Sequence, residues 1–252
     1  MKVALIIPAA GIGKRFSKNE KKQFYEINNK PILFYTLKRL LLSYDFYELI
    51  VGINKEDTDI LNNIILSLKE DKFLKEKISN IKIFQGLGGA ERVNTVLNCI
   101  KESTSDFVAI HDGVRPFVNS DVIQNVIEAG IKYNAAICAM PIRDTIKRAS
   151  NNHDLIEISE TVSRDNLYLA HTPQVFNREI IIQAIEFSLK HNLNITDEAS
   201  AYEFYSENNK EGENSLFNLN KVHIVMSNYE NIKVTYAEDK AIINTFFNLY
   251  FN

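Results

Sequence analysis

The sequence predicts an α/β protein with a Rossmann-like, doubly wound and mostly parallel sheet, from which a β-hairpin arm protrudes. Three observations support this fold. Short apolar runs alternate with segments of helical periodicity over the first 140 residues, as expected of parallel strands joined by right-handed crossovers. A loop with two glycines follows the first apolar run, and the alternation stops at Pro141.

The alternation begins with Lys2–Ile7, a short apolar run typical of a strand buried on both faces. Pro31 suits the first position of a helix, where its missing N–H is not needed. Further strands are predicted at Glu48–Ile53, Ile81–Phe84, Phe107–Ile110 and Ala135–Met140. The helices between them are predicted up to about Leu68, over Glu91–Lys101, and from Asp121, which forms a capping-box pattern with Gln124.

The segment from Ile142 to Leu167 breaks this pattern. Short mixed runs at Thr145–Ala149 and Leu155–Ile158 flank a polar turn, which predicts a hairpin. A two-stranded arm has no core of its own, so we expect it to embrace a second subunit of a homodimer. Residues 142–167 would then be a dimerisation arm inserted into one α/β domain, formed by residues 1–141 and 168–252.

The remainder of the chain returns to α/β patterning. It contains two helical segments, a strand, a short apolar run and a final helix, predicted at Arg178–Lys190, Thr196–Tyr205, Val222–Val225, Ile232–Thr235 and from about Glu238. The stretch Ser206–Asn220 is polar and rich in Asn and Glu. It is therefore predicted to be a mobile loop insertion.

Composition narrows the class of protein. The formal net charge is −3, which does not supply the broad basic face of a general nucleic-acid-binding protein. Cys99 and Cys138 stand in apolar segments without metal-ligand spacing, which predicts buried thiols in a reducing compartment. No apolar segment reaches membrane-spanning length, and the first run is too short for a signal peptide and contains Pro8. We expect a cytoplasmic protein with no nucleic-acid or membrane partner.

The loop after the first strand predicts a phosphate-binding site. Small residues and two glycines let backbone N–H groups approach a ligand closely. Three cations nearby indicate that this ligand is anionic, most simply a nucleoside triphosphate. The residues concerned are Pro8, Ala9, Ala10, Gly11, Gly13, Lys14, Arg15, Lys22 and Gln23.

Two familiar phosphate motifs do not match this loop. The dinucleotide fingerprint of a nicotinamide oxidoreductase needs glycine at position 16, where Phe16 stands. A P-loop needs Ser or Thr after Gly13-Lys14, where Arg15 stands. A tight turn with surface lysines is the alternative for the two glycines alone, and the added cations favour phosphate.

Two further loops follow predicted strands and would lie at the same edge of the sheet. Gly88–Arg92, with Thr95 one turn later, opens a helix and suits an anion or a carbonyl, or else is a simple turn. In His111–Pro116, Asp112 suits a divalent cation held partly by phosphates. Alternatively, Asp112 pairs with Arg115 across the turn. We expect His111 to be structural.

Two basic segments have a less specific pattern. Arg143–Arg148 and Ser163–Asn166 carry Arg and Thr on the two limbs of the arm, which suits a phosphate monoester but equally a solvated hairpin. In Asn231–Thr235, Lys233 stands in an apolar strand-like run. A lone lysine of this kind is most often on the surface, with its stem packed on apolar neighbours.

Taken together, these motifs resemble the 2-C-methyl-D-erythritol 4-phosphate cytidylyltransferase family over nearly the whole chain, from Val3 to about Asp239. Each motif alone has low specificity, but nine occur in the family's order. They are Pro8-Ala9-Ala10-Gly11-x-Gly13-x-Arg15, Lys22-Gln23, Gly88-Gly89-x-Glu91-Arg92, His111-Asp112-x-x-Arg115-Pro116, Arg143-Asp144-Thr145-x-Lys147, Arg164, Thr172-Pro173-Gln174, Thr196-Asp197-Glu198-Ala199 and Asn231-Ile232-Lys233-Val234-Thr235.

The resemblance implies transfer of a cytidylyl group from CTP to 2-C-methyl-D-erythritol 4-phosphate, with release of pyrophosphate, in non-mevalonate isoprenoid synthesis. It implies that Mg²⁺, or another divalent cation, bridges the phosphates near Asp112, and that a neighbouring subunit's arm supplies Thr145 and Arg164. The implied catalytic residues are Arg15, Lys22, Arg164 and Lys233. The implied nucleotide-binding residues are Ala9, Ala10, Gly11, Gly13, Lys14, Gly89, Ala90, Arg92, Thr95 and Gly113. The implied residues for the sugar-alcohol phosphate are Asp112, Arg115, Thr145, Arg164, Thr172, Thr196 and Lys233.

The chain departs from the family pattern at a few positions. Ala90 replaces a common Asp, Thr95 replaces a common Ser, and Gly113-Val114 replaces a small Ala-Ala pair. The last change is shared with ribitol 5-phosphate cytidylyltransferases, the alternative assignment, which typically lack the Arg-Asp-Thr-x-Lys arm motif found here. A catalytically silent nucleotide sensor is a further alternative, which Arg15 and Lys22 disfavour.

Overall fold

The computed structural model describes residues 1–13, 15–16, 20–152, 155–209 and 221–250. Within these residues, seven strands form one central sheet in the order β11-β7-β10-β6-β1-β4-β5. Neighbouring strands are parallel except for β10, which runs antiparallel to both β6 and β7. The strands are β1 (Val3–Pro8), β4 (Glu48–Ile53), β5 (Lys82–Leu87), β6 (Phe107–Ile110), β7 (Ala135–Pro141), β10 (Tyr168–Asn177) and β11 (His223–Met226).

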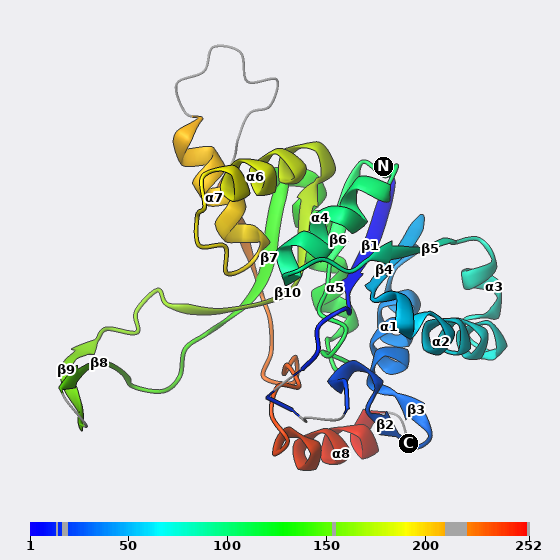
Figure 1. Cartoon of the computed structure of the whole chain (residues 1–252), viewed down its shortest axis with the longest axis horizontal. Coiled ribbons are helices and arrows are strands. Elements are labelled where there is room, and N and C mark those ends of the chain that lie inside the picture. The colour runs from blue at the N-terminus through cyan, green and yellow to red at the C-terminus, as the bar shows by residue number, and fades with distance from the viewer. Residues whose placement is uncertain (14, 17–19, 153–154, 210–220, 251–252) are drawn as a thin grey trace.

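Helices cover both faces of this sheet (Figure 1). Side chains of β1 alternate between the two faces, so Leu5 and Ile7 join one core while Ala4 and Ile6 join the other. The first core is covered by α1 (Ile32–Ser43), α2 (Thr58–Glu70), α3 (Lys75–Ser79), α5 (Ser120–Tyr133) and α8 (Asp239–Tyr250). The second core is covered by α4 (Arg92–Glu102), α6 (Arg178–Lys190) and α7 (Glu198–Asn208).

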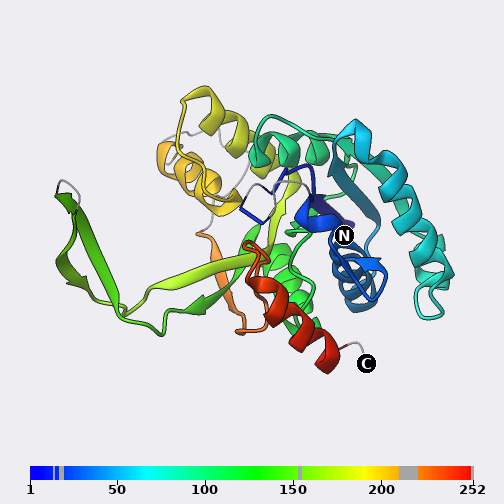
Figure 2. The same ribbon diagram turned by 60° about the horizontal axis from the view of Figure 1, so that its bottom comes forward.

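Smaller elements complete the structure. The short strands β2 (Glu26–Ile27) and β3 (Lys30–Pro31) pair antiparallel. The 3₁₀ turn η1 (Lys22–Phe24) lies beside the candidate phosphate loop, and the 3₁₀ turn η2 (Lys55–Asp57) directly precedes α2. β8 (Ile146–Asn152) and β9 (Leu155–Val162) form a separate antiparallel pair. This hairpin extends far from the body of the molecule (Figure 1; Figure 2).

The predicted fold class is confirmed, and Glu48–Ile53 and Phe107–Ile110 are strands with the predicted bounds. One strand was missing from the prediction. β10 inserts between β6 and β7, which the βα alternation places next to each other. Its sequence contains Pro173 and alternates polar with apolar residues only in part, so it does not have the apolar run that marks the parallel strands.

Three local predictions are corrected by the structure. Asp121 does not cap α5; the cap is Asn119, whose side chain accepts a hydrogen bond from the Asp121 N–H. Pro31 ends β3 and precedes the first residue of α1 rather than being that residue. The Ile232–Thr235 run is not a sheet strand but a loop, fastened by a bond from the Val234 N–H to the Val114 carbonyl.

The remaining predictions concern the second half of the chain and the surface. The helix predicted at Thr196–Tyr205 is α7, which reaches Asn208 and so occupies the start of the predicted loop Ser206–Asn220. Residues 210–220 of that loop, and residues 153–154 of the hairpin turn, lie outside the described residues. Cys99 and Cys138 are buried and unpaired, as predicted. Among the described helices, none combines the length and the apolar character needed to cross a membrane.

Glu48, at the start of β4, is a buried carboxylate that holds the connection between α4 and β6. It accepts hydrogen bonds from the hydroxyls of Ser103 at 2.7 Å, Thr104 at 2.6 Å and Ser105 at 2.9 Å. Burial alone would raise the pKa of Glu48. The hydrogen bonds from Thr104, Ser103 and Ser105 outweigh burial and hold that pKa below its ordinary value of 4.5.

We therefore expect Glu48→Gln to lower the free energy of unfolding at pH 7 by about 2 kcal/mol. A carboxylate whose pKa is lowered by folding stabilises the protein above its unfolded pKa and loses this effect as the pH falls through its folded pKa. The difference from wild type should thus shrink below about pH 4.5. Urea unfolding at pH values above and below that threshold measures the difference in the free energy of unfolding. The control is Glu128→Gln, on the exposed face of α5. A constant difference at all pH values would contradict the assignment.

Candidate active site

A cavity of about 390 Å³ lies at the carboxyl ends of the parallel strands β1, β4, β5 and β6. This edge is where open α/β sheets bind ligands. The loops after these strands supply most of the wall, together with η1, the start of α4 and the loop before α8. The lining residues are Pro8, Ala9, Ala10, Gly11, Ile12, Lys22, Gln23, Asn54, Glu56, Gly89, Ala90, Glu91, Arg92, Thr95, Asp112, Gly113, Val114 and Lys233.

The first glycine loop is held in shape by side chains around it. The buried Gln23 amide donates to the carbonyls of Ala9 at 2.7 Å and Gly11 at 3.0 Å. The Asn54 amide donates to the Ala10 carbonyl at 2.9 Å. These bonds occupy loop carbonyls. The Ala9 N–H donates to the Gly52 carbonyl at 2.7 Å, so the N–H groups from Ala10 to Gly13 are those left for an anion. Gly13 has a φ of +71°, a conformation that favours glycine.

The second glycine loop packs directly against the first. A Cβ atom on Gly88 would lie 2.6 Å from the Cβ of Ala10, so the close approach of the two loops requires glycine. The Gly89 N–H donates to the Thr95 hydroxyl at 2.9 Å, and Glu91 and Asn94 form a capping box at the start of α4. The loop is therefore ordered before any ligand binds.

Three cationic side chains pair with one buried carboxylate of this cavity, and a fourth cation lies near them. Asp112 is buried, and its oxygens lie 2.8 Å from the Lys233 amine, 3.2 Å from Arg92 Nε and 3.3 Å from Arg115 Nε. Burial would raise the pKa of Asp112, but Arg92, Lys233 and Arg115 hold that pKa well below its ordinary value. The fourth cation is Lys22, which has no carboxylate partner among the described residues.

Lys22 is the cation most open to an added anion. Its amine donates to the Val234 carbonyl at 3.3 Å. Burial is the main cause that lowers the pKa of Lys22 to about 8, and the positive charge of Lys233, which outweighs the negative charge of Asp112, contributes to the same value. A bound polyphosphate would remove this electrostatic cost. The cluster therefore carries an excess of positive charge suited to a polyanion.

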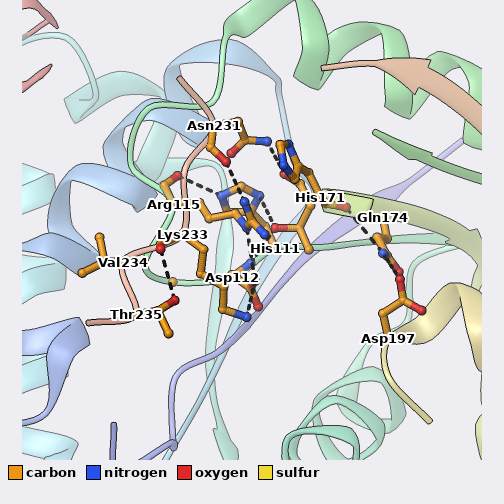
Figure 3. A network of polar contacts seen from close by, with 12 residues as sticks. His111, Asp112, Arg115, His171, Gln174, Asp197, Asn231, Lys233, Val234 and Thr235 are labelled. Carbon is orange, nitrogen blue, oxygen red and sulfur yellow. Dashed lines mark hydrogen bonds and ion pairs between the residues drawn. The ribbon is translucent and has the colours of Figure 1, made fainter. Parts of the chain in front are cut away.

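A layer of buried polar residues holds Asp112 and its cations in place (Figure 3). The Thr172 hydroxyl accepts a bond from the Asp112 N–H at 3.0 Å and contacts the His111 ring at 3.1 Å. Arg115 donates to the Asn231 carbonyl at 2.6 Å, and the Asn231 amide donates to the Thr172 carbonyl at 2.9 Å. The loop that carries Lys233 is thereby fastened to β10 and to the loop after β6.

The chain is similar to known proteins along nearly its whole length. The family model for 2-C-methyl-D-erythritol 4-phosphate cytidylyltransferase (IspD) matches residues 3–248. The chain belongs to this family. The enzyme of that name from Clostridium botulinum (strain Okra) is 36% identical over 240 residues, covering 94% of each chain. That from Acinetobacter baylyi is 36% identical over 246 residues, covering 95% of this chain and 90% of the relative.

Solved structures agree with this assignment. A crystal structure of 4-diphosphocytidyl-2C-methyl-D-erythritol synthase from Anaerococcus prevotii has a TM-score of 0.76 and 27% identity, and the match covers 98% of this chain and 96% of that one. The protein is thus a nucleotidyltransferase of the cytidylyltransferase type. The family match favours methylerythritol phosphate over the ribitol phosphate alternative.

The structure of this cytidylyltransferase brings most of the predicted nucleotide-binding residues together. Lys22, Asp112 and Lys233 also line the cavity. Lys14 lies outside the described residues. Arg15 does not line the cavity; its guanidinium lies 5.5 Å from the centre of the Tyr236 ring, beside Lys22. Lys233 is partly exposed, but its amine pairs with buried Asp112, so it is not an isolated surface lysine.

Other predicted substrate residues of the cytidylyltransferase lie away from the cavity wall. Arg115 and Thr172 are buried behind Asp112, so their contacts are with protein groups. Thr196 is exposed at the start of α7. Thr145 and Arg164 are exposed at the base of the arm, where Arg164 donates to the Arg143 carbonyl. Sequence reasoning missed Asn54 and assigned no role to Asn231, although Asn231 stands in a quoted motif. The partners of both residues are far away in the chain.

Proposed function

We propose that this protein transfers the cytidylyl group of CTP to 2-C-methyl-D-erythritol 4-phosphate and releases pyrophosphate. The observation that carries the proposal is the cationic cluster of Lys22, Arg92, Arg115 and Lys233 at the buried carboxylate Asp112, beside two preordered glycine loops. The four cations outnumber the two buried carboxylates that pair with them, Asp112 and Glu198. Such a cavity suits a triphosphate and a second phosphate held close together, which is the requirement of the reaction.

In the proposed reaction, a phosphate oxygen of methylerythritol phosphate attacks the α-phosphorus of CTP. The bond from the α-phosphorus to the oxygen that bridges it to the β-phosphorus breaks, and pyrophosphate leaves with that electron pair. No covalent intermediate on the protein is needed, because positioning and charge stabilisation suffice. We assign the triphosphate to the Ala10–Gly13 N–H groups and Lys22, and the attacking phosphate to Lys233. The predicted contact of the Ala9 N–H is not included, because that N–H donates to the Gly52 carbonyl. Arg15 would leave Tyr236 to reach the transferred group.

The residues of the cavity fit Mg²⁺ only as an ion that arrives with the nucleotide. Both oxygens of Asp112 already face cations, and no group of three or more His, Cys, Asp or Glu side chains in the described parts of the chain could hold a metal. Mg²⁺ is commonly held by one or two carboxylates, water and substrate phosphates. Asp112 would be its one protein ligand, and the ion would neutralise phosphate charge.

We further propose that residues 142–167 complete the site of a second copy of the chain. Leu155, Ile156 and Ile158 on β9 are exposed, Ile156 by 78%, and a bare two-stranded hairpin with such a surface is marginally stable in water. An arm packed on a partner would bury these side chains and carry Thr145 and Arg164 to the partner's cavity. The buried free thiols Cys99 and Cys138 support a reducing compartment, for which we propose the cytoplasm.

Pyrophosphate release tests the proposed reaction. The protein is mixed with CTP and Mg²⁺ and with either methylerythritol phosphate or ribitol 5-phosphate. We expect rapid release with the first acceptor and release at least about 100-fold slower with the second, because a site built for one polyol leaves polar groups unpaired with the other. Equal rates, or release with ribitol phosphate alone, would contradict the proposal.

The pH dependence of the reaction should report the protonation of Lys22. Deprotonation removes its charge as the pH rises, so kcat/KM for CTP should fall above about pH 8. Lys22→Arg keeps its charge throughout this range and should lose this alkaline limb. Both profiles are measured from initial rates over a range of about two pH units below and above the pKa of Lys22. An identical limb in both proteins would exclude Lys22 as its source.

Arg164→Ala should weaken the binding of the sugar-alcohol phosphate much more than the binding of CTP. The KM for the sugar-alcohol phosphate should rise by about 30-fold through loss of a charge-assisted contact.

A mixture of Arg164→Ala and Lys22→Ala chains tests the partner's role. If the arm acts in trans, a mixed dimer has one intact site, and an equal mixture regains about a quarter of wild-type activity. No recovery after exchange, or a monomer by sedimentation with full activity, would contradict the dimer.

A further inference from the structure

The inference concerns Glu198, a fully buried acidic residue outside the cavity wall. Its relative exposure is 0%, and it is the first residue of α7. One carboxylate oxygen accepts a hydrogen bond from an Arg92 NH group at 2.5 Å. The other oxygen has no hydrogen-bond partner among the described residues. A buried, half-satisfied carboxylate is costly, so its one strong contact identifies what it does.

The position of Glu198 is fixed independently of Arg92. Asp197 caps α7 by accepting a hydrogen bond from the Ser200 N–H. Gln174, which is buried on β10, accepts from the Ala199 N–H at 3.1 Å and donates to Asp197 at 2.8 Å. Figure 3 shows this Gln174–Asp197 contact beside the Asp112 cluster. The first turn of α7 is thus anchored to the sheet, and the helix N-terminus favours the negative charge of Glu198.

Arg92 connects this anchored carboxylate to the cavity. Its Nε donates to Asp112 at 3.2 Å while its NH1 donates to Glu198. Only two of the five N–H groups of a guanidinium are used in this way, and the Arg92 side chain remains 33% exposed at the cavity wall. The two carboxylates therefore set the plane of the guanidinium and leave donors for a ligand.

We propose that Glu198 is a positioning residue that holds Arg92 ready for CTP. This inference rests on the proposed function in that CTP is the ligand. Without the Glu198 charge, Arg92 retains only its contact with Asp112 and can turn away from the nucleotide. Binding then includes the cost of ordering a flexible side chain. The effect should fall on CTP affinity and not on the chemical step, because Glu198 does not reach the cavity.

The test uses Glu198→Gln, which keeps the shape of the side chain and removes its charge. We expect KM and the calorimetric Kd for CTP to rise about tenfold, which is the scale of one charge-assisted hydrogen bond, with kcat within about twofold of wild type. Glu186→Gln is the matched control. Glu186 lies on the neighbouring α6 and forms an exposed ion pair with Lys101 of α4. Removal of its charge should leave CTP affinity unchanged.

A double-mutant cycle with Arg92→Gln separates positioning from a structural role. If Glu198 acts through Arg92, Glu198→Gln causes no further loss of CTP affinity in the Arg92→Gln background. Equal losses in both backgrounds, or a fall in kcat without a change in Kd, would overturn the proposal. Should Glu198→Gln not fold, Glu198→Asp keeps the charge but is shorter by one methylene, and it should raise the Kd for CTP about threefold; an unchanged Kd would overturn the proposal.

Calorimetry with CTP alone keeps the two proposals distinguishable. A wild-type protein that binds CTP but does not use methylerythritol phosphate would refute the proposed reaction and leave the role of Glu198 open to the same cycle. A wild-type protein that uses both substrates, with unchanged CTP affinity in Glu198→Gln, would refute only the positioning role.

Discussion

Lys22→Ala should lower kcat by about 10²- to 10³-fold while leaving the affinity for CTP within a few-fold of wild type. In the free protein, Lys22 is a partly buried ammonium without a carboxylate partner among the described residues, and it shares the cavity with Lys233. Its interaction with the ligand grows as negative charge develops around the α-phosphorus. A contact that strengthens in this way acts on the transition state more than on the bound substrate. Steady-state kinetics and calorimetry with CTP separate the two effects.

The adjacent lysine provides a matched control. Lys21 does not line the cavity, and its amine lies 2.6 Å from Asp57 and 3.2 Å from Glu56, which balance its charge. Lys21→Ala should keep kcat within about threefold of wild type, because it removes only a partly exposed ion pair. Comparable losses of kcat in the two variants would show that the segment around η1 is needed only for folding. An unchanged kcat in Lys22→Ala would exclude the proposed mechanism.

Arg15 shows why the two predicted transition-state cations are not equivalent in this structure. Its guanidinium lies over the ring of Tyr236 and 3.5 Å from the Tyr236 hydroxyl, whereas Lys22 is already in the cavity wall. In the proposed reaction, Arg15 would have to leave Tyr236 to reach the ligand, and part of its interaction energy would offset that change. The sequence pattern places both cations near the loop, but it cannot report which one is preorganised.

The same distinction separates what could and could not be predicted about the fold. Strands β1, β4, β6 and β7 are buried on both faces, and continuous apolar runs of this kind are recognisable without any knowledge of their neighbours. β10 was missed because several of its side chains are polar and serve the site. Thr172 bonds to the Asp112 N–H and Gln174 bonds to the start of α7. These polar residues interrupt the pattern from which a strand is recognised.

The site was predictable at the level of motifs and not at the level of partners. Glycine loops after strands indicate a ligand edge from local sequence alone. The bonds that shape those loops join residues far apart in the chain, such as Asn54 to Ala10 and Arg115 to Asn231. Lys233 shows the difference most clearly. Its apolar neighbours resemble a strand, yet they form a loop whose position is set by Asn231 and Val114.

Asp112→Asn should lower the free energy of unfolding by about 3 kcal/mol or more, the scale found when one partner of a buried ion pair is removed. The substitution keeps the shape of the side chain but leaves Arg92, Arg115 and Lys233 without the negative charge that they share. Arg115 is buried and cannot regain water. Thermal and urea unfolding at low ionic strength measure the loss. The control is Asp45→Asn, which breaks one exposed pair with Lys77 and should cost less than about 1 kcal/mol.

Added polyanions should reveal why Asp112→Asn lowers the free energy of unfolding. If Asp112→Asn is destabilised by uncompensated cations, then pyrophosphate or CTP binds the folded state of the variant and raises its Tm more than that of wild type. Lys233→Met in the same chain should recover part of the stability, since it removes the closest of the three charges. The two changes must then be strongly non-additive. Equal shifts with pyrophosphate in both proteins, or simple additivity, would mean that Asp112 does not balance the cluster and that the cavity has no stored charge to offer a triphosphate.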